Sequence, residues 1–218
     1  MTFLIPTSIP ARAPSLVSRT AEWRGQQGTA WARRNPPTVE ALDESYLQRF
    51  GITRTALNRE MLAGVPVTAS VLEVGCSAGR QLDVLGTMGF KDLKGVDIAA
   101  GALATCHWPS WVADATCLPF PDKHFDLVMT SGTLMQIPPQ DKWRCVAEMK
   151  RVSRRWLYCC EVWTALNTTW DYSDLMPPSW TCDWVAIMDS PEWPVVRSRI
   201  LDSGDKSPLE AFLMDKRA

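Results

Sequence analysis

The sequence predicts an α/β protein with a Rossmann-like, doubly wound sheet of seven strands, mostly parallel and ending in a C-terminal antiparallel hairpin. Short β-rich runs alternate with helical runs over about 90 residues, which is typical of βαβ units in a parallel sheet. After Pro194 the pattern changes, because the apolar runs at 195–201 and 209–214 flank a turn that contains Gly, Ser and Pro. This second pattern predicts the hairpin.

The first part of the chain precedes the predicted sheet. Residues 1–37 hold five prolines and show little periodicity, so we expect an irregular arm that begins with a flexible tail over 1–19. Apolar residues recur at helical spacing from 39 to 50, which predicts a helix. A second helix is expected over 53–62, after the break at Gly51.

The alternating region supplies the remaining elements. Five strands are expected at 70–75, 93–97, 111–113, 125–130 and 156–162. Helices are expected at 80–88, 99–104 and 140–152. Gly89 follows the first of these helices, in the position where glycine commonly ends a helix.

Composition argues against several classes of protein. The formal net charge of −1 makes a nucleic-acid partner unlikely at the level of the whole chain. No window approaches the run of about 20 apolar residues that spans a bilayer, so no membrane partner is expected. The seven cysteines are odd in number and form no Cys-x-x-Cys pair, so we expect no disulfide framework, no metal site and a reducing, cytoplasmic location.

A glycine-containing turn follows the first predicted strand, in the sequence Val-Leu-Glu-Val-Gly-Cys-Ser-Ala-Gly at 71–79. Gly75 and Gly79 bracket the turn, where the missing Cβ atoms let a ligand approach the backbone. The helix after the turn offers unpaired N–H groups at its N-terminus. By itself, such a turn serves packing as readily as ligand binding.

Acidic residues follow the next two strands. Asp97 ends the second strand, where a carboxylate accepts hydrogen bonds from ribose hydroxyls, although it could equally cap the next helix. Asp114 ends the third strand, where it could accept a hydrogen bond from an adenine amino group or stabilise a turn. Acids at successive strand ends favour a nucleoside site.

These motifs resemble the class I S-adenosylmethionine-dependent methyltransferases over roughly residues 20–218. The first motif of that family appears at 73–79, and its block around Leu-Pro-Phe appears at 118–128. The Gly-x-Gly-x-x-Gly motif of nicotinamide enzymes is absent. The resemblance implies a bound S-adenosylmethionine, with contacts from Glu73, Gly75, Cys76, Ser77, Gly79, Asp97, Ile98, Asp114, Ala115, Thr130 and Gly132.

A narrower resemblance, to the methylase group associated with pseudaminic acid biosynthesis, rests on the motif Trp-x-Gly-x-x-Gly-x-x-Trp-x-x-Arg-Asn at 23–35 and on residues 50–60. It implies that the arm and helices of residues 20–66 cover the cofactor, with contacts from Trp31, Arg34 and Asn35. Residues 67–218 would then form the methyltransferase domain. The group tends to have His in the loop after the fourth strand, where this chain has Gln136.

Methyl transfer from a sulfonium is an in-line displacement of an activated group, so alignment and exclusion of water matter more than a strong base. The two histidines, His107 and His124, fall in connecting loops and are poor candidates for a base. Better candidates for acceptor contact or catalysis are Glu161, Tyr172 and Asp171, at or beyond the fifth strand. Glu161 could instead cap the next segment or pair with an arginine.

Four of the eleven tryptophans, Trp163, Trp170, Trp180 and Trp184, cluster at 163–184, within an insertion expected at about 163–193. Three interpretations are open for this cluster. It could be the core of a small lid, a stacking surface for a sugar or base, or a cage for a cationic acceptor.

The expected function is methyl transfer to a small molecule, such as a sugar or another polar metabolite. One alternative is a nucleic-acid methyltransferase, for which Arg24, Arg33 and Arg34 of the arm are the only basic indication. A second alternative is a non-catalytic protein that binds S-adenosylmethionine. No feature of the sequence predicts the oligomeric state.

Overall fold

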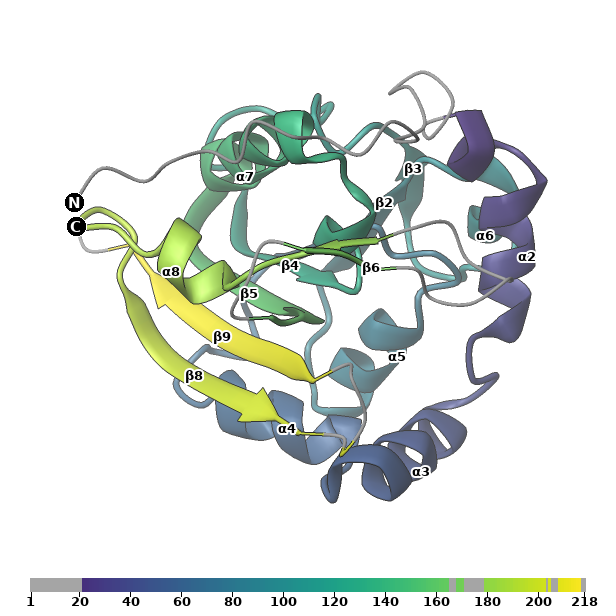
Figure 1. Cartoon of the computed structure of the whole chain (residues 1–218), viewed down its shortest axis with the longest axis horizontal. Helices are drawn as coiled ribbons and strands as arrows, with labels where there is room; N and C mark the ends of the chain where they lie inside the picture. Colours follow the sequence, from purple (N-terminus) through teal and green to yellow (C-terminus); the bar gives the residue numbers. More distant parts are fainter. Residues whose placement is uncertain (1–20, 165–167, 171–178, 203, 205–207, 217–218) are drawn as a thin grey trace.

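A seven-stranded sheet forms the centre of the computed structural model, which describes residues 21–164, 168–170, 179–202, 204 and 208–216. The strands are β1 Val71–Val74, β2 Leu93–Asp97, β3 Ser110–Val112, β4 Phe125–Ser131, β5 Ser153–Val162, β8 Val195–Leu201 and β9 Leu209–Asp215. In the order β3-β2-β1-β4-β5-β9-β8, the first five strands run parallel, and β9 pairs antiparallel with both of its neighbours (Figure 1). The predicted fold class is confirmed.

Helices cover both faces of the sheet (Figure 1). On one face lie α4, Arg54–Met61, and α5, Arg80–Thr87. On the other lie α7, Pro139–Val152, and α8, Trp184–Met188. Two further helices, α3 (Val39–Phe50) and α6 (Ala100–Leu103), contact α4 and β2, respectively. Because both faces are covered, all four residues of β1 are buried, as in other parallel sheets.

Capping residues set the ends of the two helices that precede the sheet. The hydroxyl of Thr38 accepts a hydrogen bond from the backbone N–H of Ala41 and begins α3. Gly51, at φ +69°, ends α3 in the left-handed conformation that favours glycine. The hydroxyl of Thr53 then begins α4 by accepting from the N–H of Ala56. The chain therefore turns sharply between the helices, and α4 reaches the sheet.

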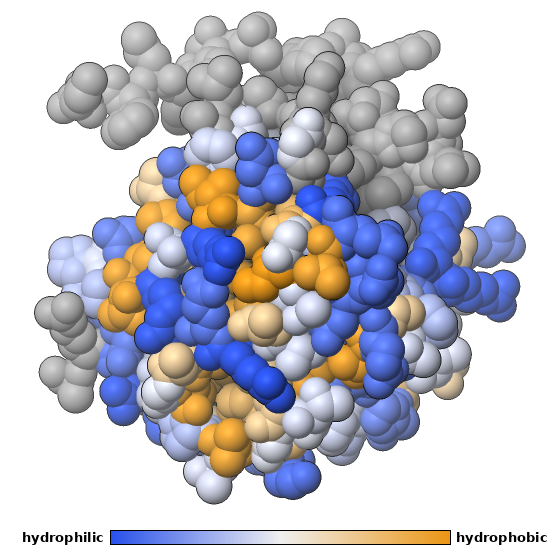
Figure 2. Space-filling model, turned by 90° about the horizontal axis from the view of Figure 1, so that it is seen from below, coloured by the Kyte–Doolittle hydropathy of each residue, from blue (hydrophilic) through white to orange (hydrophobic). Residues whose placement is uncertain are grey.

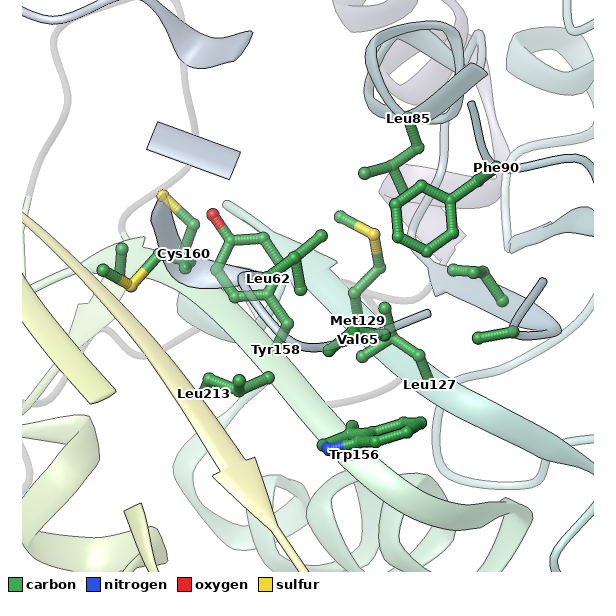
Figure 3. Close-up of a cluster of buried hydrophobic side chains, with 14 of the residues drawn as sticks. Leu62, Val65, Leu85, Phe90, Leu127, Met129, Trp156, Tyr158, Cys160 and Leu213 are labelled. Carbon is green, nitrogen blue, oxygen red and sulfur yellow. The ribbon is translucent and has the colours of Figure 1, made fainter. Parts of the chain in front are cut away.

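One hydrophobic core lies between α4, α5 and the sheet. Figure 3 shows side chains from the strands packing against side chains from the segments that cover them. Among these core residues are Leu62, Leu85, Phe90, Leu127, Met129, Trp156 and Tyr158. The hydroxyl of Tyr158 donates to Oδ1 of Asn58 at 2.8 Å, and both residues are buried. Arg54, also buried, donates to the Tyr46 hydroxyl at 2.9 Å. These polar bonds tie α3, α4 and β5 together within the core.

Part of the N-terminal arm is helical, so the expectation of irregular structure over residues 1–37 is wrong there. Gln26–Arg34 form α2, which lies beside α6 (Figure 1). A Cβ atom at Gly28 would lie 2.5 Å from Cβ of Ala99, and one at Gly101 would lie 2.1 Å from Oγ1 of Thr29. The two glycines therefore permit close contact between these segments. The tail expected at 1–19 lies outside the described residues.

The Trp-rich insertion adds elements that the sequence pattern did not predict. Strand β6, Thr168–Trp170, pairs antiparallel with β7, Ser179–Thr181, and α8 follows. Trp184 is fully buried, and its indole N–H donates to the carbonyl of Val162 at 2.8 Å. Trp180 is also buried. For these two residues the structure supports the interpretation as a lid core, whereas the side chain of Trp170 lies outside the described residues.

One face of the molecule exposes apolar side chains in separate patches. Figure 2 shows such patches interrupted by hydrophilic residues on the face that it presents. Within the described ranges, no helix combines the length and the apolarity needed to cross a membrane.

Glu210 of β9 gives a test of how the insertion is anchored. Its Oε2 accepts hydrogen bonds from the backbone N–H groups of Trp184 and Val185 at the start of α8. Burial raises its pKa from 4.5 to about 7. The folded state therefore favours the protonated form. The stability that Glu210 contributes is full below pH 4.5 and is lost as the pH rises through about 7.

We expect thermal unfolding to show this loss when the wild type is compared with Glu210→Gln, whose side chain does not titrate. The melting temperature of the wild type should fall relative to that of the variant between pH 4.5 and pH 8. A constant difference across this range would contradict the raised pKa.

Candidate functional site

A cavity of about 380 Å³ opens at the carboxyl ends of β1, β2 and β4. It is lined by the turn after β1, by residues that follow β2 and β3, by the loop after β4 with the start of α7, and by the arm. Ligands of open α/β sheets bind at this edge. The structure therefore brings most of the predicted site residues together.

The turn after β1 exposes its backbone to the cavity. Gly75, Ser77 and Gly79 all have positive φ angles, of +76°, +50° and +79°. A Cβ atom at Gly75 would lie 2.2 Å from Oγ1 of Thr133, so a larger residue there would push away the loop after β4. Gly75, Cys76 and Ser77 line the cavity, whereas Gly79 packs against Cys106 and begins α5.

Asp97 connects this turn to the end of β2. Its Oδ2 accepts from the backbone N–H of Ser77 at 2.8 Å, and its Oδ1 accepts from the N–H of Ala99 at 2.8 Å. The second bond joins residues two apart and closes a turn before α6. The N-cap of α6 is Ala99, without a side-chain cap bond, so the helix-capping role that the sequence also allowed for Asp97 is wrong. Each carboxylate oxygen has a further lone pair, and Asp97 lines the cavity beside Ile98. Burial raises the pKa of Asp97.

Glu73, at the end of β1, has one oxygen without a partner. The residue is buried and lines the cavity, and its Oε2 has no hydrogen-bond partner among the described residues. Burial raises the pKa of Glu73 well above its usual value, and the positive charge of Arg54 opposes this shift. Because a buried carboxylate oxygen is costly to leave unpaired, Glu73 is suited to bind a donor or a cation in the cavity.

Asp114 lies in the cavity wall after β3, next to Ala115. Its Oδ1 accepts from the N–H and the hydroxyl of Thr116, which is the turn role considered above. Its Oδ2 lies 3.8 Å from Nη2 of Arg24, in the arm. This ion pair brings the arm to the edge of the cavity.

The arm contributes other residues to the lining. Trp31 and Asn35 line the cavity, and Nδ2 of Asn35 donates to Oγ of Ser77 at 3.5 Å. Trp23 also lines the cavity, a contact that the sequence motif contained but that we did not predict. Arg34 is exposed and does not line the cavity.

Two predicted residues lie beneath the cavity instead of in its wall. Thr130 and Glu161 are fully buried, and neither lines the cavity. Oε1 of Glu161 accepts from the Thr130 hydroxyl at 2.8 Å and from the N–H of Thr133 at 3.1 Å, and Oε2 accepts from the N–H of Met135 at 3.4 Å. Glu161 therefore holds the loop after β4, and the structure does not place it where an acceptor in the cavity would contact it. Asp171 and Tyr172 lie outside the described residues.

The loop after β4 and the first turn of α7 form the other end of the cavity. Ser131, Gly132, Met135, Gln136 and Asp141 line it there. Nε2 of Gln136 donates to Oγ of Ser179 in β7 at 2.9 Å, while its buried Oε1 has no partner within the described residues. No signal in the sequence pointed to the contact with Ser179, because it joins residues far apart in the chain.

Residues 72–156 match the family of methyltransferase domains. This segment contains all of β1 except Val71, the strands β2, β3 and β4, and the turn at 75–79, together with Asp97 and Asp114. The match confirms the prediction that the chain is a methyltransferase. No curated protein matches the chain.

Several solved structures are similar to the chain over most of its length. Magnesium protoporphyrin IX methyltransferase from Synechocystis, with bound S-adenosylmethionine, aligns with a TM-score of 0.66 at 11% identity and covers 96% of this chain and 100% of that one. The 1,6-didemethyltoxoflavin-N1-methyltransferase from Burkholderia thailandensis aligns with a TM-score of 0.66 at 12% identity, over 98% of this chain and 94% of that one. These similarities show the fold.

The role of Glu161 can be tested by Glu161→Gln. The amide would turn an N–H toward the donors of the loop, so we expect the free energy of unfolding to fall by roughly 1–3 kcal/mol. Urea denaturation measures this change. Thr130→Val, which removes one of the three donors, is the matched control and should destabilise the protein less. A Glu161→Gln protein as stable as the wild type would show that Glu161 does not hold the loop.

Proposed function

We propose that this chain transfers the methyl group of S-adenosylmethionine to a small polar molecule. The observation that carries the proposal is the placement of Asp97 and Glu73 around the turn at 75–79. The buried carboxylate of Glu73 and the partly buried carboxylate of Asp97 line the cavity and have remaining acceptor capacity. They lie beside a backbone turn in which Gly75, Ser77 and Gly79 have positive φ angles. A nucleoside that also bears a cationic amino-acid group has the matching chemistry.

The lining residues fit S-adenosylmethionine. The free lone pairs of Asp97 would accept hydrogen bonds from the ribose hydroxyls, as acids at the end of a second strand do in nucleotide-binding folds. The unpaired Oε2 of Glu73 would accept from the ammonium group of the methionine part. Asp114 and Ala115 would lie against the adenine.

S-adenosylmethionine supplies a methyl group that the positive charge of its sulfonium has already activated. The residues of the chain then need to align the acceptor and exclude water. Trp31 of the arm and Met135 and Ile137 after β4 supply apolar surface for that purpose. Among the described residues no histidine lines the cavity, so the proposal assigns no strong base.

The acceptor end of the cavity favours a molecule with O–H or N–H groups. Oε1 of Gln136 and the carboxylate of Asp141 are both hydrogen-bond acceptors, Oε1 of Gln136 has no donor among the described residues, and both residues line this end. Two structural neighbours are named for small-molecule methyl acceptors, a magnesium porphyrin and a toxoflavin precursor, which supports an acceptor of that class. The narrower sequence resemblance makes a sugar related to pseudaminic acid the first acceptor to test.

Replacing Asp97 with Ala is expected to weaken binding of S-adenosylhomocysteine by roughly 1–3 kcal/mol, because the ribose loses a charged acceptor. Isothermal titration calorimetry measures the change. Asp122→Ala removes an exposed carboxylate that pairs with Arg151 and should leave the affinity unchanged. Wild-type affinity in Asp97→Ala would remove Asp97 from the site.

The reaction itself is tested with a donor that carries an isotope-labelled methyl group. The purified chain is incubated with this donor and with separate small-molecule, nucleic-acid and protein fractions of a host extract. We expect label in the small-molecule fraction together with release of S-adenosylhomocysteine. Label confined to nucleic acid or protein would overturn the proposed acceptor class, and tight binding without any transfer would overturn catalysis.

A further inference from the structure

One polar group in the cavity has no role in the proposed function: the indole N–H of Trp23. Trp23 lines the cavity, and its Nε1 is buried without a hydrogen-bond partner in the described part of the chain. Buried indole N–H groups usually find an acceptor. A ligand in the cavity is therefore a natural partner for this donor.

Contacts that do not involve the N–H hold Trp23 in place. Its ring meets that of Trp31 edge to face, with centroids 6.4 Å apart and an interplanar angle of 89°. Its carbonyl oxygen packs against Gly28, where a Cβ atom would lie only 2.3 Å away. The side chain is thus positioned by packing, which leaves its donor available for a bound molecule.

The neighbours of Trp23 indicate which part of the ligand it meets. The adjacent Arg24 pairs with Asp114 after β3, and Gly28 packs on Ala99, two residues after Asp97. In the proposed function these two strand ends bind the adenosine. Adenosine offers ring nitrogens and ribose oxygens as hydrogen-bond acceptors, so its chemistry matches an indole donor.

We propose that Trp23 is a further cofactor-binding residue, whose indole N–H donates a hydrogen bond to the adenosine part of S-adenosylmethionine. This inference rests on the proposed function. It also assigns a binding task to the arm: the arm supplies a specific donor in addition to covering the cavity.

The proposal predicts that Trp23→Phe leaves the stability of the ligand-free protein unreduced and lowers its affinity for the ligand. Phenylalanine keeps an aromatic ring and removes a donor that is unpaired in the ligand-free protein, so the melting temperature without ligand should not fall. The affinity for S-adenosylhomocysteine should fall by about threefold to tenfold, the usual effect of one hydrogen bond. The affinity for 5′-methylthioadenosine, which keeps the nucleoside but lacks the amino-acid part, should fall by the same factor.

Calorimetry with both ligands and thermal unfolding without ligand provide these values. Trp143→Phe is the matched control, because Trp143 is 58% exposed on α7 and does not line the cavity. An unchanged affinity in Trp23→Phe, or a loss for S-adenosylhomocysteine alone, would overturn the inference. Joint loss of melting temperature and affinity would point to a structural role and overturn it as well.

A second measurement serves if Trp23→Phe does not fold. In wild-type protein with ¹⁵N-labelled tryptophan, the indole N–H resonance of Trp23 should shift on addition of 5′-methylthioadenosine. An unmoved resonance at saturating ligand would overturn the inference and leave the proposed function intact. A wild type that binds neither ligand would instead overturn the proposed function.

Discussion

The site depends on the bond between Asp97 and the backbone N–H of Ser77. This bond fixes the turn after β1 to the end of β2, across neighbouring parallel strands. The fixed turn brings Gly75 against Thr133, so the loop after β4 packs on the same point. The positive φ angles that this path requires explain why glycines bracket the turn. The cavity is therefore a consequence of how three strand ends are joined.

Buried carboxylates at this edge of the sheet differ in how many donors they already bind. Burial raises the pKa of both Glu73 and Glu161, since removal from water disfavours the charged form. Three donors from the chain satisfy Glu161, and its task is to hold a loop. Oε2 of Glu73 has no donor among the described residues. The number of hydrogen bonds already made thus separates a structural carboxylate from one suited to bind a ligand.

The strands and the turn at 75–79 could be predicted because their signals are local: short apolar runs, glycines and acids at strand ends. The sequence resemblance implies that Thr130 contacts the cofactor, but the next residue, Ser131, lines the cavity instead. The hydroxyl of Thr130 donates to Glu161. Adjacent strand residues face opposite sides, and the sequence does not state which side the last residues of β4 present. Helix α2 was missed because close packing at Gly28, a tertiary contact, holds it in place.

The two ends of the cavity also differ in whether local sequence signals or contacts between distant segments define them. The end proposed to bind the cofactor is built from turns directly after β1, β2 and β3, so a short motif identifies it. The end proposed for the acceptor relies on bonds between distant segments: Gln136 to Ser179, and Nζ of Lys142 to the carbonyl of Trp180 at 2.7 Å. Lys142 also lies 4.4 Å from the Trp184 ring, and burial lowers its pKa to about 8. These bonds attach the insertion to α7 and the loop after β4, and they involve neither Asp97 nor the turn at 75–79. In the proposed function, the short sequence motifs therefore identify the residues for the methyl donor and do not identify those at the acceptor end.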